Sequence, residues 1–226
     1  MKQYIRESYD YFDINYNVAI ESAIDIMKEK IGKIIDKIKK LLVKLINWMK
    51  DIFKKKINDM ENKIQTNNPP QIQRQFAKDS FGAIFKSKEF LEKPIRSFIK
   101  IMDIESHPDG VESKVDTHIQ IVELKIHDID NIISKEYNST DYITLNISVL
   151  KELYSTFEKF IVQIKNNITD FSNDRDLYSN HVTTLDEKAK SDLLLYYNLS
   201  ISCLNSNLKL IIQNQKLINH IFSSLE

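Results

Sequence analysis

Histidine and cysteine are the residues of this sequence whose types could support metal or nucleophilic chemistry. His118 and His127 fall in one helical segment, and their nine-residue spacing places them on opposite helix faces, where they cannot chelate one ion. Glu123 lies four residues before His127, but this makes only two ligands where a zinc site needs three or four. Cys203 is predicted on the outer side of a heptad helix, without a paired histidine. We therefore predict no metal ligand and no cysteine nucleophile.

Acid pairs and catalytic signatures lead to the same expectation. Asp128 with Asp130, and Asp174 with Asp176, are expected in solvated surroundings, where carboxylates seldom act as catalytic acids. The chain has three Gly, four Pro and one Cys, too few for phosphate-binding loops, thiolate metal sites or a disulfide framework. It contains no Walker, kinase, zinc-protease or nucleophile-elbow signature. The sequence predicts a non-enzymatic protein with no catalytic residue, no cofactor and no small-molecule substrate.

A lysine-rich segment is the most distinctive feature of the chain. Lys plus Arg and Asp plus Glu both number 32, yet residues 28–56 hold eleven lysines against three acids, a local charge of +8. The preceding residues carry −3 and the following residues −5. Lysine in place of arginine favours nonspecific electrostatic contact over bidentate recognition. The lysine face, our candidate surface for an anionic partner, comprises Lys30, Lys33, Lys37, Lys40, Lys44, Lys50 and Lys54.

An apolar stripe follows the same segment. Apolar residues recur every seven positions from Ile24 to Ile52, which predicts one long basic amphipathic helix within residues 22–66, ending before Pro69 and Pro70. The stripe is wide enough to pack in a protein core. Alternatively, the helix lies on an anionic membrane through its stripe, or coats nucleic acid with its lysines while the stripe stays packed. The candidate apolar contact face comprises Ile31, Ile38, Leu45, Trp48, Ile52 and Phe53.

The remaining chain is predicted to be helical, so the fold class is all-α. Residues 71–106 are expected to form short helices with a Phe-rich face, and residues 111–226 an antiparallel three-helix bundle that follows a turn at 107–110. Residues 142–149 alternate loosely, but belong to a longer helical period. Charge and Asn in residues 170–176 are expected to end the second helix of that bundle.

The last helix has the most regular pattern of the sequence. A coiled-coil-like heptad repeat runs from Leu194 to Leu225, and its polar member Gln215 is expected to set the register of the bundle or the partner number. The longest charge-free stretch, Leu193 to Leu208, is too short and too polar to span a bilayer. Residues 1–21 are acidic and aromatic, are expected to form an arm or a short docking segment, and lack the pattern of a signal peptide.

One resemblance adds to these patterns. The run from Ile31 to Lys40 (IGKIIDKIKK), with Lys54, Lys55 and Lys56 at its end and a Tyr-rich start before it, resembles the N-terminal part of structural proteins from large tailed phages of low-GC Gram-positive bacteria. The resemblance covers this helix only. It implies a phage-encoded virion component, located in the virion or in the host cytoplasm, whose helical body is packaged in or assembled onto the particle.

Together, these observations predict a helical structural or interaction protein. Its partner is expected to be a protein or a second copy of the chain, with nucleic acid or an anionic membrane surface as further candidates for contact through residues 28–56. Two alternatives remain open from the sequence. The first is a helical effector or inhibitor that binds a host protein through the bundle face around its last heptads, and the second is a membrane-surface-active protein.

Overall fold

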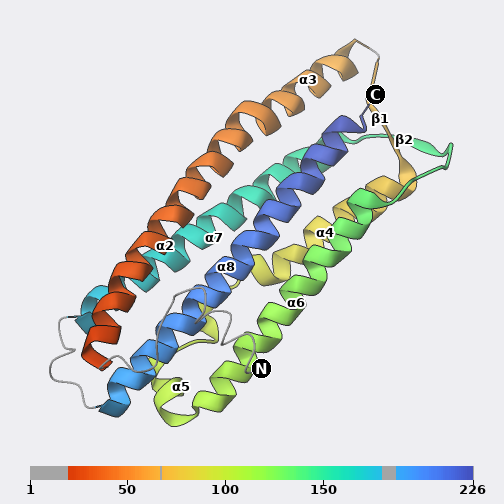
Figure 1. Cartoon of the computed structure of the whole chain (residues 1–226). Coiled ribbons are helices and arrows are strands. Elements are labelled where there is room, and N and C mark those ends of the chain that lie inside the picture. Colours follow the sequence, from red (N-terminus) through yellow and green to blue (C-terminus); the bar gives the residue numbers. More distant parts are fainter. Residues whose placement is uncertain (1–19, 67, 180–186, 226) are drawn as a thin grey trace.

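The computed structural model describes residues 20–66, 68–179 and 187–225, and this part of the chain is an all-α bundle with one small two-stranded ribbon (Figure 1). The predicted fold class is therefore confirmed; residues 1–19 of the expected arm lie outside the described residues. The elements in chain order are α2 (Ile20–Trp48), the π-helical η1 (Met49–Phe53), α3 (Lys54–Gln65), β1 (Gln71–Gln73), α4 (Arg74–Leu91), the 3₁₀ turn η2 (Ile95–Ser97), α5 (Ile101–Ser106), α6 (Pro108–Ser134), β2 (Tyr142–Thr144), α7 (Ile147–Ser179) and α8 (Glu187–Ser223).

The long helices pack around α8. Helices α2, α6 and α8 run in one direction, while α4 and α7 run in the opposite direction (Figure 1). Helix α8 packs on all four of the others, and α4 lies between α6 and α7 and packs on both. The three helices predicted for residues 111–226 thus keep their alternating directions, but they share their core with α4 and α2.

Helix α8 is buried on nearly every side. Its heptad residues Ile201, Leu204 and Ile211 are buried, and so are Leu210 and Leu217 on other faces. Apolar and uncharged polar residues on most sides of the helix are thus covered, which places α8 in the middle of the bundle. Cys203 is therefore fully buried, and its predicted position on an outer face is wrong because α8 has partners on both sides of the heptad stripe.

One nearly continuous helical rod carries the lysine-rich segment. Helix α2 passes directly into η1 and then α3, so that residues 20–65 are helical without interruption. The buried residues Leu45, Met49, Phe53 and Ile57 are spaced by four, which is wider than the 3.6-residue period of an α-helix. The wider π turn accommodates this spacing and keeps these side chains facing the core where a regular α-helix would rotate them away.

The ribbon corrects one prediction. Residues 142–144 form a strand in place of the expected helix, and β2 pairs antiparallel with β1 so that Ile72 lies opposite Ile143. Outside the ladder, Leu145 N donates to Pro70 O at 2.9 Å and Arg74 N donates to Asp141 O at 2.9 Å. The loose alternation after residue 141 thus reflects a real strand, whose partner comes from a distant part of the chain.

Two helix boundaries also differ from the predictions. Helix α6 begins at Pro108, within the expected turn, because proline suits the first helical position. Helix α7 continues through residues 170–176 to Ser179. There Asp170 and Asp174 lie one turn apart and both contact Arg96, so the acidic stretch that was expected to end the helix instead anchors it.

Candidate functional site

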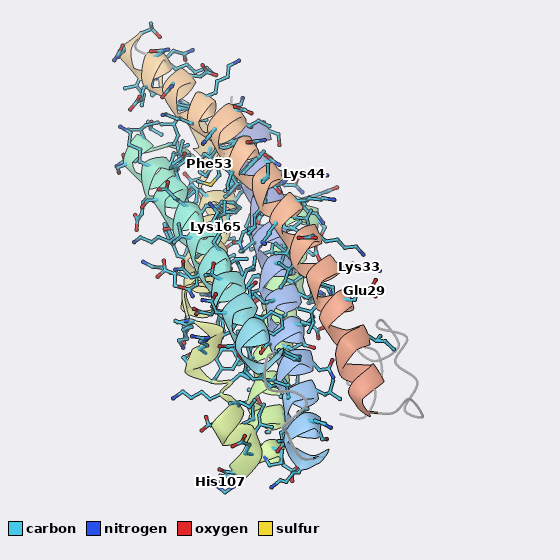
Figure 2. All side chains as sticks on the ribbon, turned by 90° about the vertical axis from the view of Figure 1, so that its left-hand side faces the viewer. Glu29, Lys33, Lys44, Phe53, His107 and Lys165 are labelled. Atoms are coloured by element: carbon cyan, nitrogen blue, oxygen red, sulfur yellow. The ribbon has the colours of Figure 1, made fainter. Side chains whose placement is uncertain are left out.

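The lysine face lies on the outer side of α2, η1 and α3. Lys33, Lys37, Lys40, Lys44, Lys50 and Lys54 are all exposed, while the side chain of Lys30 lies outside the described residues. Figure 2 shows Lys33 and Lys44 directed away from the bundle and Phe53 directed into it. This separation follows from the helical period, which places the lysines and the apolar stripe on different sides of one rod.

Most charges of the lysine face are uncompensated. Lys33 Nζ lies 2.5 Å from Glu29 Oε1, one turn earlier, and the hydrogen bond and charge of Lys33 lower the pKa of that carboxyl. Within the described ranges, no acid forms an ion pair with Lys37, Lys40 or Lys44, nor with the lysines farther along the rod. The surface therefore presents a row of free ammonium groups over several helical turns.

The candidate apolar contact face is occupied by the protein itself. Ile31, Ile38, Leu45, Trp48 and Phe53 are buried, and only Ile52 is largely exposed, at 46%. Trp48 Nε1 donates a hydrogen bond to Asn219 Oδ1 at 3.0 Å, which fixes α2 to α8. The Trp48 ring also packs edge-on against Phe157 of α7, with ring centroids 5.3 Å apart. A membrane contact through this stripe would require the rod to leave the bundle.

The face of α8 around its last heptads is also covered. Leu217, Ile218 and Phe222 are buried, so the effector alternative would need α8 to be uncovered before a host protein could bind there. Gln215 is half-buried at its heptad position, whereas the adjacent Asn214 is fully buried. Asn214 Nδ2 donates to Ser87 Oγ of α4 at 3.1 Å, a polar link across the core that was not predicted.

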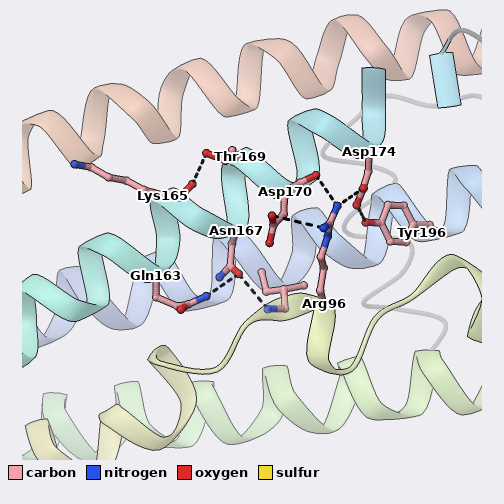
Figure 3. Close-up of polar contacts among 9 residues, drawn as sticks. Arg96, Gln163, Lys165, Asn167, Thr169, Asp170, Asp174 and Tyr196 are labelled. Atoms are coloured by element: carbon pink, nitrogen blue, oxygen red, sulfur yellow. Dashed lines mark hydrogen bonds and ion pairs between the residues drawn. The ribbon is translucent and has the colours of Figure 1, made fainter. Parts of the chain in front are cut away.

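A second polar cluster joins η2, α7 and α8, and the sequence did not reveal it (Figure 3). The Arg96 guanidinium pairs with the Asp174 carboxylate and donates to Asp170 O at 3.1 Å. Tyr196 of α8 donates its hydroxyl to Asp174, and burial together with this hydrogen bond raises the pKa of Tyr196. Asn167 Oδ1 accepts from Ile95 N at 3.1 Å. Asp174, expected in a solvated loop, is therefore a structural link.

The cavity beside this cluster is too small for a substrate. Its volume is about 10 Å³, and its lining includes Arg96, Asn167, Tyr196 and Ser200. Such a space holds about one water molecule. The cluster therefore joins three elements of the fold, and it offers no room for a reacting ligand.

The histidines and the cysteine stand apart from one another. His118 is half-buried, and its Nε2 donates to Asn207 Oδ1 at 2.8 Å, while its ring packs on Phe98. His127 is exposed. Burial raises the pKa of the Cys203 thiol, which disfavours the reactive thiolate. No group of three potential metal ligands occurs in the described part of the chain.

Comparisons with known proteins give no relative on which to base a function. No protein-family model matches the chain, and no match was found among curated proteins or among solved structures. Among the residues that the structure describes, no helix is both long enough and apolar enough to cross a membrane.

Proposed function

We propose that this chain is a non-enzymatic helical interaction protein that binds an anionic partner through its lysine face. The observation that carries the proposal is the division of the α2–η1–α3 rod into two sides. The apolar side packs into the core, as Phe53 and Trp48 illustrate. The lysine side is exposed, and of its described lysines only Lys33 forms an ion pair. A rod arranged in this way contributes charge to a partner, and its contact is electrostatic.

A virion is the assembly that we propose for this function. The resemblance of Ile31–Lys40 to the N-terminal helices of phage structural proteins supports this setting. Lysine also suits dense contact with phosphates or carboxylates, because its ammonium makes few demands on partner geometry.

Binding of the full chain to a sulfated polysaccharide and to double-stranded DNA tests the proposal. We expect binding at low salt that weakens steeply as salt rises, because each lysine that neutralises a phosphate releases a counterion. The triple variant Lys37→Gln/Lys40→Gln/Lys44→Gln should bind roughly tenfold or more weakly, with a salt slope smaller by about three.

A matched control removes the same charge from other helices. The variant Lys86→Gln/Lys159→Gln/Lys165→Gln changes three exposed lysines of α4 and α7 and should bind nearly as the wild type does. Equal losses in the two variants would show that net charge and not the lysine face matters, which would refute the proposal. Salt-insensitive binding to phosphatidylserine-containing vesicles would replace it with the membrane alternative.

A further inference from the structure

The basic rod and helix α6 form opposite edges of the bundle. Helix α2 packs on α7 and α8, whereas α6 packs on α8, α4 and α5. Figure 1 shows α2 and α6 on opposite sides of α8, and Figure 2, viewed from the α2 side, places α6 behind the bundle. A partner that binds to the α2 edge therefore leaves the α6 edge accessible, and a partner on α6 leaves α2 accessible.

The α6 edge has the opposite charge. Residues 101–134, which comprise α5 and α6, hold eight acids against two lysines, a local charge of −6. Five of the acids follow one another at steps of three, four, seven and seven, a spacing that aligns them on one face of a helix. This acidic row comprises Asp109, Glu112, Asp116, Glu123 and Asp130. Lys114 and Lys125 fall on the opposite flank of α6, at about 100° per residue.

The first acids of the row repel one another. Burial raises the pKa of Glu112, and the neighbouring charges of Asp109 and Asp116 raise it further. Within the described residues, no cation forms an ion pair with any of these three carboxylates. The negative potential at Asp109, Glu112 and Asp116 is thus concentrated and not neutralised by a paired cation, as is true of most lysines of the lysine face.

The two edges also match in direction and length. Helices α2 and α6 both run parallel to α8 (Figure 1). They contain 29 and 27 residues, which correspond to about 44 and 40 Å. A second copy that is shifted sideways without rotation would therefore bring its α6 alongside the α2 of the first copy.

We propose that the acidic row of one copy docks on the lysine face of the next copy, so that the chain assembles head to tail. This inference rests on the proposed function and identifies its anionic partner as a second copy of the same protein. The contact joins two different surfaces, so each copy added leaves one lysine face and one acidic row free, and growth is open-ended unless the geometry closes a ring. The lysines are exposed, and the acids of the row are exposed or half-buried. Solvent and salt therefore screen the pairs, and assembly is weak, concentration-dependent and sensitive to salt.

Sedimentation of the full chain tests this assembly. At about 0.05 M salt the average mass should rise with protein concentration, and at about 1 M salt it should fall to the 26.6 kDa of one chain. Two variants separate the surfaces. Lys37→Gln/Lys40→Gln/Lys44→Gln neutralises the lysine face, and Glu112→Gln/Asp116→Asn/Glu123→Gln neutralises the acidic row.

Each variant alone should sediment as a single chain. Their mixture should form a complex of twice the chain mass and no larger species, because each complex retains only neutralised surfaces at its ends. The lysine control on α4 and α7 should assemble as the wild type does. A wild type that stays monomeric at low salt, or a mixture that forms no complex, would overturn the inference. If the wild type stays monomeric but still binds polyanions through its lysine face, the self-assembly is refuted and the proposed function is retained.

Discussion

Replacement of Phe53 by alanine should strongly destabilise the protein, because this side chain joins the basic rod to two other helices. Phe53 is 0% exposed, and its ring contacts Trp48, Tyr154 of α7 and Phe222 of α8 at centroid distances of 5.6, 5.3 and 5.1 Å. Truncation of a buried Phe to Ala costs about 3–5 kcal/mol. The three ring contacts place Phe53→Ala at the upper end, at about 5 kcal/mol.

Urea unfolding followed by circular dichroism measures this loss. A loss of about 5 kcal/mol is a large part of the roughly 5–15 kcal/mol by which most domains are stable. For a chain of this length it corresponds to a fall in Tm of about 10–20 °C. Ile52→Ala is the matched control, because the neighbouring side chain is 46% exposed and its truncation should cost about 1 kcal/mol or less.

A small effect would contradict the packing of the rod. If Phe53→Ala cost no more than Ile52→Ala, the apolar stripe would not be held in the core in solution. The stripe would then be free to insert into a lipid surface. That result would favour the membrane alternative over electrostatic binding through the lysine face.

Two further predictions concern polar groups inside the bundle. Burial lowers the pKa of His118 below its usual 6.5, so the imidazole binds a proton more readily in the unfolded chain than in the folded protein. The contribution of His118 to the free energy of unfolding should therefore be fully present above about pH 6.5 and should decline as the pH falls below that value. His118→Asn should flatten this slope in urea midpoints measured from about pH 7.5 to 5, and an equal slope in both proteins would refute the assignment. Tyr196→Phe removes the hydroxyl that donates to Asp174 and should cost about 1–2 kcal/mol in urea unfolding, whereas the exposed Tyr142→Phe should change little; equal costs would argue against the link.

Long-range periodicity made much of the fold predictable. The spacing of Ile31, Ile38 and Leu45 specified a helix with one buried side, and these residues are buried. The central position of α8 also left a signal, since the charge-free stretch Leu193–Leu208 is what a helix buried on all sides requires. The heptad alone pointed to one buried stripe, so Cys203 was placed outside by mistake.

Contacts between distant segments were not predictable from one sequence. Arg96 is 74 residues from Asp170 and 78 from Asp174, and no local pattern connects them. The one-turn spacing of the two aspartates was visible, but charge in a stretch with Asn suggested a loop. The β1–β2 ribbon was missed for the same reason, because a three-residue strand is stabilised by its partner and not by its own propensity.

The central place of α8 determines when the bundle can form during translation. Helices α2, α4, α6 and α7 all pack on α8, yet each of them leaves the ribosome before α8 does. The hydrogen bond between Trp48 and Asn219 spans 171 residues. The apolar side of the basic rod can therefore be covered by α8 only after synthesis has reached Asn219. Until then the nascent chain exposes the apolar stripe together with the lysines, and exposed apolar surface of this kind favours aggregation of incomplete chains.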